Sequence, residues 1–219
     1  MPDAIDVTGT AWHNLIDMTL AEYYENYAKK PNEEILRRAS VKEEELRRVF
    51  KEFPFKTNAS EVRVAVLGCG DKRFVPHHRR IFEKLTGKPV DLTTFDLDIE
   101  HLTGKLGTVQ HDVTTPLPGE PFDITYGHVF LKFIETEKQW DVIQNSYDAL
   151  TSPGLAIHVF DIDELAAKTE KLADGLFSVP LDRWQKKLRD AGVEFKFIPW
   201  IIEKIITEPV EGAALVLKK

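Results

Sequence analysis

Short apolar runs alternate with amphipathic stretches along most of the chain. This pattern predicts strands that alternate with helices. The clearest run, 62–67, is too short for a helix and rich in β-branched residues, which is typical of a strand buried on both faces. It ends in Gly68-Cys69-Gly70, where two glycines permit a tight turn. A helix is then predicted from near Pro76 to a stop at Gly87. Strand, glycine turn and helix form the opening unit of a doubly wound sheet, which binds ligands at the carboxyl end of the strand.

The same alternation continues after Gly87. The apolar runs predict five further strands, and the amphipathic stretches between them predict helices. The strands are expected at 90–95, 122–126, 155–160, 193–198 and 213–217, and the helices through 140–150 and around 164–172 and 181–191, while 108–110 follows a segment of uncertain form. Alternation this regular indicates an α/β fold with a mainly parallel sheet, covered by helices on both faces.

The first 56 residues show the spacing of helices. Apolar residues recur at three- and four-residue steps from Trp12 onward, which predicts an amphipathic helix. Pro31 interrupts this pattern, and Ser40 lies three residues before a glutamate, the spacing of a capping box, so a second helix is expected to begin at Ser40. We therefore divide the chain into an N-terminal helical extension, residues 1–56, as a lid or acceptor region, and an α/β domain, residues 57–219.

Composition and charge narrow the possible functions. The chain has 219 residues, 42% of them hydrophobic and 30% charged, which suits one large soluble domain or a domain with an appendage. A net charge of -7 argues against constitutive, sequence-blind nucleic-acid binding, although a local basic face stays open. The single cysteine excludes an internal disulfide and a cysteine-based zinc site, and no metal site is expected. The N-terminus lacks the form of a signal peptide, and no apolar run reaches the roughly 18–20 residues that span a bilayer, so a cytoplasmic protein is expected.

Several short motifs occur in an order that resembles the class I methyltransferases that use S-adenosylmethionine. The matching motifs are Gly68-Cys69-Gly70, Asp96 at the end of the second strand, Asp112, Phe122-Asp123-Ile124, and Leu150 with Pro153-Gly154. The resemblance covers about residues 60–219. It implies a Rossmann-like, doubly wound sheet that is mainly parallel and ends in an antiparallel hairpin.

The resemblance also implies S-adenosylmethionine as the cofactor and assigns a site. Asp96 would hold the ribose hydroxyls and Asp112 would contact the adenine amino group. The position of Asp96, about one β-α-β unit after the glycines, suits a carboxylate that accepts both hydroxyls of a ribose. The expected cofactor-binding residues are Leu67, Gly68, Cys69, Gly70, Lys72, Asp96, Leu97, Asp112, Val113 and Gly127.

Methyl transfer needs alignment of two reactants more than a catalytic triad, because the methyl carbon is already activated. A base is needed only if the acceptor has a proton to lose. His128, after the fourth strand, is the first candidate base, and Asp161, at the end of the fifth, is the second; a surface or capping role for His128 stays open. His158, inside a strand, is expected to be a core histidine. The acidic charge favours a small-molecule acceptor over nucleic acid, and nothing indicates the oligomeric state.

Two positions depart from the family pattern and leave alternatives open. Val66 stands where an acidic residue is usual, and Lys72 replaces the third glycine, where it could pair with the cofactor's carboxylate or obstruct the pocket. A non-catalytic Rossmann-like binding module is therefore a second hypothesis. An NAD(P)-dependent oxidoreductase is a third, but Arg73 at the third glycine of the dinucleotide fingerprint and the terminal hairpin count against it. The tyrosines of residues 23–27 could form a lid, although such a stripe more often serves packing.

Overall fold

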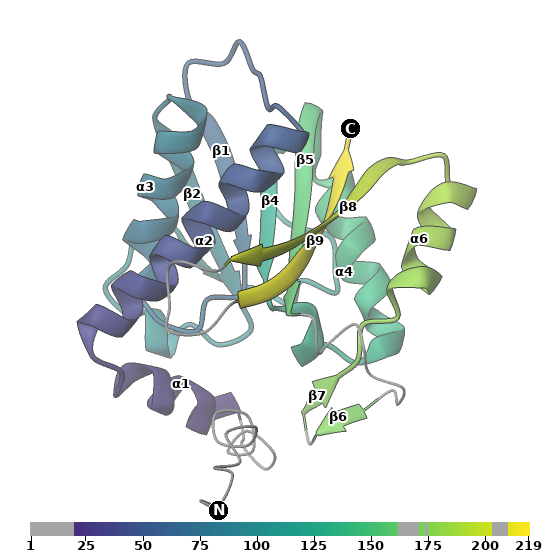
Figure 1. The fold of residues 1–219 in the computed structure, drawn as a ribbon. Coiled ribbons are helices and arrows are strands. Elements are labelled where there is room, and N and C mark those ends of the chain that lie inside the picture. Colours follow the sequence, from purple (N-terminus) through teal and green to yellow (C-terminus); the bar gives the residue numbers. More distant parts are fainter. Residues whose placement is uncertain (1–19, 162–170, 174, 203–209) are drawn as a thin grey trace, which may run out of the picture.

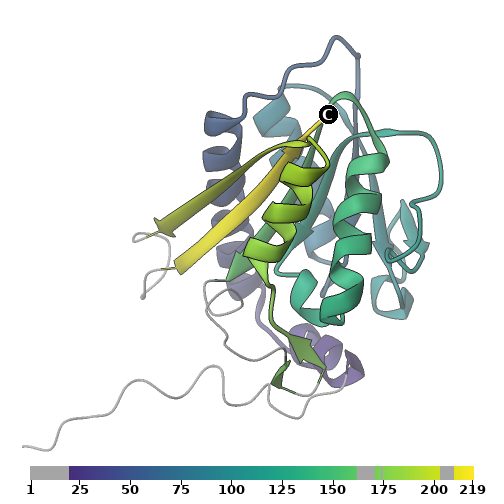
Figure 2. The same ribbon diagram turned by 90° about the vertical axis from the view of Figure 1, so that its right-hand side faces the viewer.

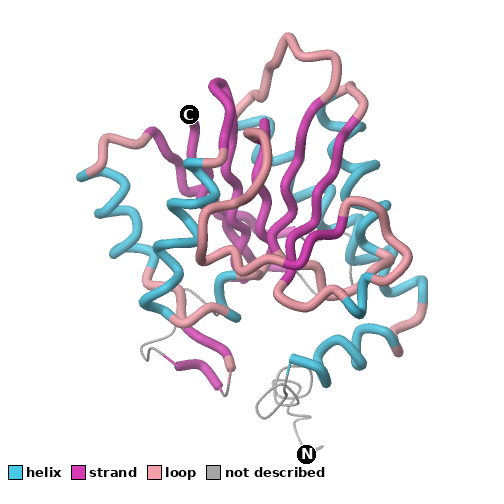
Figure 3. Tube along the Cα trace, turned by 180° about the vertical axis from the view of Figure 1, so that it is seen from behind, coloured by secondary structure: helices cyan, strands magenta, loops and turns pink. Residues whose placement is uncertain are grey.

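The computed structural model describes residues 20–161, 171–173, 175–202 and 210–219. Within them, seven strands form one twisted sheet in the order β3-β2-β1-β4-β5-β9-β8 (Figures 1 and 3). Neighbouring strands run parallel from β3 to β5, whereas β9 is antiparallel to both β5 and β8. The strands are β1 (Val62–Leu67), β2 (Val90–Asp96), β3 (Thr108–Gln110), β4 (Phe122–His128), β5 (Leu150–Asp161), β8 (Glu194–Ile202) and β9 (Val210–Lys218). The expected mainly parallel sheet with an antiparallel end is thus confirmed.

Helices cover both faces of the sheet (Figures 1 and 2). The helices α2 (Asn32–Glu52) and α3 (Phe74–Thr86) pack on one face, and α4 (Thr136–Asp148) and α6 (Leu181–Asp190) pack on the other. Side chains of β1 alternate between the two layers: Val64 and Val66 join the α2–α3 core, and Ala65 and Leu67 join the α4–α6 core. A strand that is apolar at nearly every position is therefore required, as the sequence of β1 predicts.

The second helix begins earlier than the capping-box pattern predicts. It starts at Asn32, directly after Pro31, whose backbone is extended, and Ser40 lies in its interior. The Ser40 hydroxyl donates to the Leu36 carbonyl oxygen at 3.0 Å, so it caps no helix end. Proline suits a helix start, and ion pairs from Glu34 to the arginines one turn later support the first turns. The prediction that the helix begins at Ser40 is therefore wrong.

Helix α2 shares the hydrophobic core of the sheet. Its Ile35, Leu46 and Val49 are almost completely buried and belong to the same cluster as the inner side chains of β1, β4 and β5. Helix α2 can therefore bury its apolar stripe only by packing on the sheet. The division of the chain at residue 56 stays a prediction.

The other elements agree with the sequence pattern except near the C-terminal third. Helix α3 begins at Phe74, two residues before Pro76, and ends at Gly87, whose φ of 69° is left-handed as in a glycine helix stop. Of the helix predicted around 164–172, residues 162–170 lie outside the described residues, and Lys171–Ala173 is a short strand, β6, paired with β7 (Leu176–Phe177). This β6–β7 hairpin is a correction to the expected helix.

Helix α1 (Leu20–Ala28) lies beyond the carboxyl ends of the parallel strands, at the same end of the molecule as the β6–β7 hairpin (Figures 1 and 3). The earlier part of the predicted first helix, with Trp12, lies outside the described residues. None of the described helices has the length and apolar character needed to cross a membrane.

Truncating a buried leucine of α2 tests whether this helix is part of the core. Leu46 is fully buried, so Leu46→Ala should lower the free energy of unfolding by about 2–5 kcal/mol. Leu36, on the same helix, is 52% exposed, so Leu36→Ala is the matched control and should change stability by no more than about 0.5 kcal/mol. Urea unfolding curves measure both, and equal small effects would show that α2 is a dispensable appendage.

Candidate functional site

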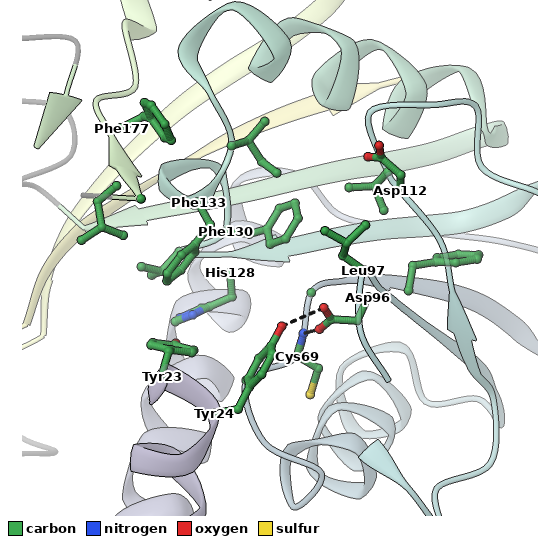
Figure 4. Close-up of a pocket in the computed structure, with 18 of the residues that line it drawn as sticks. Tyr23, Tyr24, Cys69, Asp96, Leu97, Asp112, His128, Phe130, Phe133 and Phe177 are labelled. Atoms are coloured by element: carbon green, nitrogen blue, oxygen red, sulfur yellow. Dashed lines mark hydrogen bonds between the residues drawn. The ribbon is translucent and has the colours of Figure 1, made fainter. Parts of the chain in front are cut away.

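A pocket of about 660 Å³ lies at the carboxyl ends of the parallel strands (Figure 4). It is lined by the glycine turn after β1, the segments that follow β2, β3 and β4, the first described helix and the strand β7. This is the edge at which doubly wound sheets bind their ligands, because the chain leaves every parallel strand there through a loop.

The glycine turn is tightly packed against aromatic rings. Gly68 has a left-handed φ of 74°, and its N–H donates to the Phe95 carbonyl oxygen at 2.8 Å. A Cβ at Gly68 would lie 2.3 Å from the ring of Phe130, and one at Gly70 would lie 3.0 Å from the ring of Tyr23. Both glycines are therefore needed for the conformation of the turn and for the close approach of these rings.

Asp96, the last residue of β2, joins the turn to α1. Its carboxylate is 7% exposed; Oδ2 accepts the Cys69 N–H at 2.8 Å and Oδ1 accepts the Tyr24 hydroxyl at 3.0 Å (Figure 4). Burial raises the pKa of Asp96. The hydrogen bond from the Cys69 N–H and the nearby His101 lower this pKa, but the effect of burial is larger. Each carboxylate oxygen keeps a second lone pair, so the group can accept further hydrogen bonds from a diol.

Two further contacts hold α1 over the turn. The Tyr24 ring stacks on His101, with centroids 3.7 Å apart and planes 10° apart, and His101 Nε2 lies 2.6 Å from the Cys69 carbonyl oxygen. Arg73 donates to the carbonyl oxygens of Tyr27 and Lys30 at 2.8 Å each, at the end of α1. The residue at the third-glycine position of the dinucleotide pattern thus anchors this helix.

Asp71 completes that anchor. It is buried and forms an ion pair with Arg73 at 2.6 Å. Burial alone would raise the pKa of Asp71, but the hydrogen bonds and charge of Arg73 outweigh it, so the pKa lies below the usual range and the carboxylate stays ionised.

The far end of the pocket combines apolar surface with a second carboxylate. Leu97 is 60% exposed although it is large and apolar, and Val113 is buried close by in the lining. Asp112 is exposed, and its Oδ1 accepts the backbone N–H and the hydroxyl of Thr114, which lower the pKa of Asp112. Apolar side chains beside a carboxylate suit a flat heterocycle with an exocyclic amino group.

A buried charged cluster reaches the pocket from α2. Glu45 is 3% exposed, and its Oε2 lies 2.9 Å from His128 Nε2. Burial raises the pKa of Glu45. The positive charge of Lys42, which is also buried and lies one helical turn earlier, lowers this pKa but does not cancel the effect of burial. Burial and Lys42 both lower the pKa of His128, so the imidazole is neutral near pH 7. The neutral ring is one-fifth exposed and lines the pocket.

The structure brings most of the predicted site residues together. Those that line the pocket are Gly68, Cys69, Gly70, Asp96, Leu97, Asp112, Val113 and His128. Those that do not line it are Leu67, Lys72, Gly127 and Asp161. Lys72 is exposed, so it does not obstruct the pocket, and Asp161 pairs with Lys132 at 3.3 Å. The roles of all these residues stay predictions.

Two further side chains carry potentially reactive groups. The Cys69 thiol is buried, which raises its pKa to about 12, so it is a poor nucleophile. His158 is a core histidine as predicted: it is 2% exposed, and its Nε2 lies 2.9 Å from the Ser146 hydroxyl. Among the described residues, no cluster of three or more His, Cys, Asp or Glu side chains could hold a metal ion.

Sequence reasoning missed the contribution of α2. Lys42 and Glu45 occupy positions on the helix stripe that also holds Leu46 and Val49, and charged residues among buried positions are the signal that could have identified them. It also missed His101, Phe130 and the hairpin residue Phe177, whose positions relative to the pocket depend on long-range folding. The tyrosines of α1 contribute to the site: Tyr23 and Tyr24 line the pocket.

Comparison with known proteins gives fold similarity without sequence matches. No protein-family model and no curated protein matches the sequence. The plantazolicin methyltransferase BpumL, solved with a desmethyl-plantazolicin analogue and S-adenosylhomocysteine, has a TM-score of 0.59 at 13% identity, over 91% of this chain and 90% of that chain. A Listeria monocytogenes protein proposed to be a class I S-adenosylmethionine-dependent methyltransferase has a TM-score of 0.55 at 10% identity, over 93% and 69% of the two chains.

A third structure, a variant of LepI solved with S-adenosylhomocysteine and a substrate analogue, has a TM-score of 0.54 at 16% identity and covers 78% of this chain. This chain spans 46% of the length of LepI. The chain has the fold of class I S-adenosylmethionine-dependent methyltransferases. At these identities the similarity concerns the fold alone, so the function has to be argued from the site.

Removing Arg73 tests the anchor of α1. Arg73→Ala should release the Tyr27 carbonyl group near the end of the helix and the Lys30 carbonyl group just beyond it, so amide hydrogen exchange in residues 24–28 should become roughly tenfold faster. Arg79→Ala, an exposed arginine of α3, is the matched control and should leave that exchange unchanged. Unchanged exchange in both variants would show that Arg73 does not hold the helix.

The pH dependence of stability tests the buried charge of Glu45. Because its pKa is raised in the folded protein, the folded state binds the proton more tightly than the unfolded chain above about pH 4.3, and the stabilisation from this group falls as pH rises toward neutrality. Glu45→Gln should remove this pH-dependent contribution. Between about pH 4.3 and neutrality, the unfolding free energy of the variant should therefore fall less, or rise more, than that of the wild-type protein. Glu44→Gln, on the exposed side with Arg47 and Arg48, is the control and should keep the wild-type slope. The same slope in all three proteins would contradict a raised pKa.

Proposed function

We propose that this protein is an S-adenosylmethionine-dependent methyltransferase. The observation that supports this most is the Asp96 carboxylate, fixed by the Cys69 N–H at the ligand edge of the sheet with lone pairs left for a ribose diol. The fold agrees with this proposal, and so does the shared pocket of Asp96, Leu97 and Asp112.

The donor set fits the nucleoside part of such a cofactor. Asp96 would accept the ribose hydroxyls, Leu97 and Val113 would flank the base, and Asp112 would accept the amino group of adenine. Bound S-adenosylmethionine supplies a methyl group that is already activated on a sulfonium sulfur. The remaining task of the protein is to orient an acceptor and exclude water, for which the rings of Tyr23 and Phe130 over the glycine turn are placed.

We further propose a small-molecule acceptor. The pocket of about 660 Å³ lies partly beneath α1 and the β6–β7 hairpin, which leaves room for a cofactor and a compact second ligand. The net charge of -7 disfavours a polyanionic acceptor. A nicotinamide dinucleotide is disfavoured by the fold, because dinucleotide-binding sheets continue after the fifth strand with a parallel strand, whereas β9 is antiparallel to β5.

A non-catalytic binding module is the second candidate, and the observation that favours it is the Tyr24 hydroxyl on Asp96 Oδ1. If this contact persists, one oxygen of the carboxylate stays partly engaged. Cofactor affinity therefore separates the two functions.

Calorimetric titration with S-adenosylhomocysteine tests the proposal. The wild-type protein should bind with micromolar affinity, and Asp96→Ala should weaken binding at least about a hundredfold, because a buried charge-assisted contact to the diol is lost. Asp91→Ala, exposed at the opposite end of β2, is the matched control and should bind normally. Binding of NAD in a parallel titration, without binding of S-adenosylhomocysteine, would favour a dehydrogenase; no binding of either would favour the non-catalytic module.

A further inference from the structure

The pocket has two chemically different halves (Figure 4). Asp96, Leu97 and Asp112 lie on one side, and the labelled residues Tyr23, His128, Phe133 and Phe177 lie on the other. The second half is mainly apolar and aromatic: it is lined by Tyr23, Phe130, Phe133, Ile134, Leu176 and Phe177. A surface of this composition binds flat apolar molecules through ring contacts and burial of apolar area.

His128 lies at the wall of this apolar half, which also includes the Tyr23 hydroxyl and, next to Ile134, the exposed Glu135. Among the described residues, Glu45 contacts its Nε2 at 2.9 Å, and the ring also interacts with the backbone of His128 itself. Above its raised pKa of about 7, Glu45 is ionised, and a carboxylate at Nε2 selects the tautomer with the proton on Nε2, so the lone pair lies on Nδ1. A buried carboxylate that orients an imidazole also stabilises the imidazolium that forms when the ring takes a proton.

We propose that the apolar half of the pocket binds a flat aromatic acceptor with a hydroxyl group, and that Glu45 positions His128 to remove the hydroxyl proton. This inference rests on the proposed methyltransferase function. Glu45 is a positioning residue here, because it touches His128 and does not line the pocket.

The lining explains why a phenol-type hydroxyl fits better than other acceptor groups. A carboxylate or an ammonium group would carry its charge into an apolar aromatic wall, which is costly without a paired charge. A neutral phenol with an ordinary pKa of about 10 enters without that cost, but it is a weak nucleophile until it loses its proton. A neutral histidine at the wall of the same half supplies the proton acceptor that this chemistry needs.

The step balances in atoms and charge. The acceptor hydroxyl gives its proton to Nδ1 of His128, and an electron pair of the oxygen forms the new bond to the methyl carbon. The bond between that carbon and the sulfonium sulfur breaks, and its electrons stay on sulfur. The products are an aryl methyl ether, a neutral thioether and a protonated imidazole. Release of this proton from the imidazole to solvent restores the base.

Several charged groups set the basicity of His128. Lys42 and Glu45 face it from α2, His78 from α3, Lys132 from the segment after β4, and Asp161 from the end of β5. Burial and the two lysines favour the neutral ring, while Asp161 and the backbone contact of the ring favour the protonated ring, as does Glu45 when it is ionised. His128 is therefore neutral near pH 7 and can accept a proton, and the nearby carboxylates limit how far its pKa is lowered.

A binding experiment tests the acceptor class, with 2-naphthol as the probe and protein saturated with S-adenosylhomocysteine. Fluorescence titration should show saturable binding of 2-naphthol, at least about tenfold tighter than of 2-naphthoate, which has the same rings but a carboxylate. Phe133→Ala should weaken naphthol binding about tenfold. Leu106→Ala, 86% exposed and remote from the lining, is the control and should not change it. Equal or tighter binding of naphthoate, or no naphthol binding by protein that binds S-adenosylhomocysteine, would overturn this inference and leave the proposed function intact.

Two further measurements test Glu45: the protonation of His128, which needs no turnover, and kcat. At pH 8, the ¹⁵N chemical shifts of His128, assigned by difference with His128→Asn, should show a proton on Nε2 and none on Nδ1 in the wild-type protein. Glu45→Gln should lower the pKa of His128 and reduce kcat for methylation of 2-naphthol by about 10- to 100-fold, with KM changed less than about threefold. Glu44→Gln should match the wild type in both. A proton on Nδ1 in the wild type, or an unchanged pKa and kcat in Glu45→Gln, would overturn the role of Glu45. If the wild-type protein does not bind S-adenosylhomocysteine, the proposed function itself is refuted.

Discussion

The site depends on one hydrogen bond, from the Cys69 N–H to the Asp96 carboxylate at 2.8 Å. The donor belongs to the glycine turn after β1 and the acceptor ends β2, so the bond fixes the relative position of two neighbouring strand ends. Gly68 supports it with a second bond from its N–H to the Phe95 carbonyl oxygen. A carboxylate held in this way is oriented before a ligand arrives, which lowers the ordering cost of binding.

Helix α1 is attached to the same junction. Tyr24 donates to Asp96, stacks on His101, and lies on a helix whose end is held by Arg73. The cover of the pocket and the carboxylate inside it are thus linked through one side chain. A ligand that competes with Tyr24 for Asp96 Oδ1 would remove one of the contacts that hold α1 over the glycine turn.

Much of the fold could be predicted from the sequence, because local patterns determine it. The apolar run of β1, the glycine turn and the left-handed stop at Gly87 are visible without a structure, and they establish the ligand edge of the sheet. The start of α2 could not be predicted from Ser40, since a capping-box spacing also occurs inside helices, where the hydroxyl bonds back to the preceding turn.

The candidate site was predictable only where it lies on the sheet. Asp96 and His128 are the last residues of their strands and Asp112 follows one, so topology brings them together. Glu45 is 83 residues from His128 along the chain, and no local pattern pairs the two. Lys72 illustrates the opposite error: it is adjacent to the turn in sequence, yet its side chain is exposed and does not line the pocket.

The central claim is that Asp96 holds the diol of a nucleoside cofactor. The most direct test compares binding of S-adenosylhomocysteine with binding of its 2′-deoxy analogue, in wild-type protein and in Asp96→Ala. The wild-type protein should bind the deoxy analogue at least about tenfold more weakly, and the variant should bind both ligands equally, because the partner of the missing hydroxyl is absent. Equal affinity of the wild-type protein for the two ligands would contradict this account.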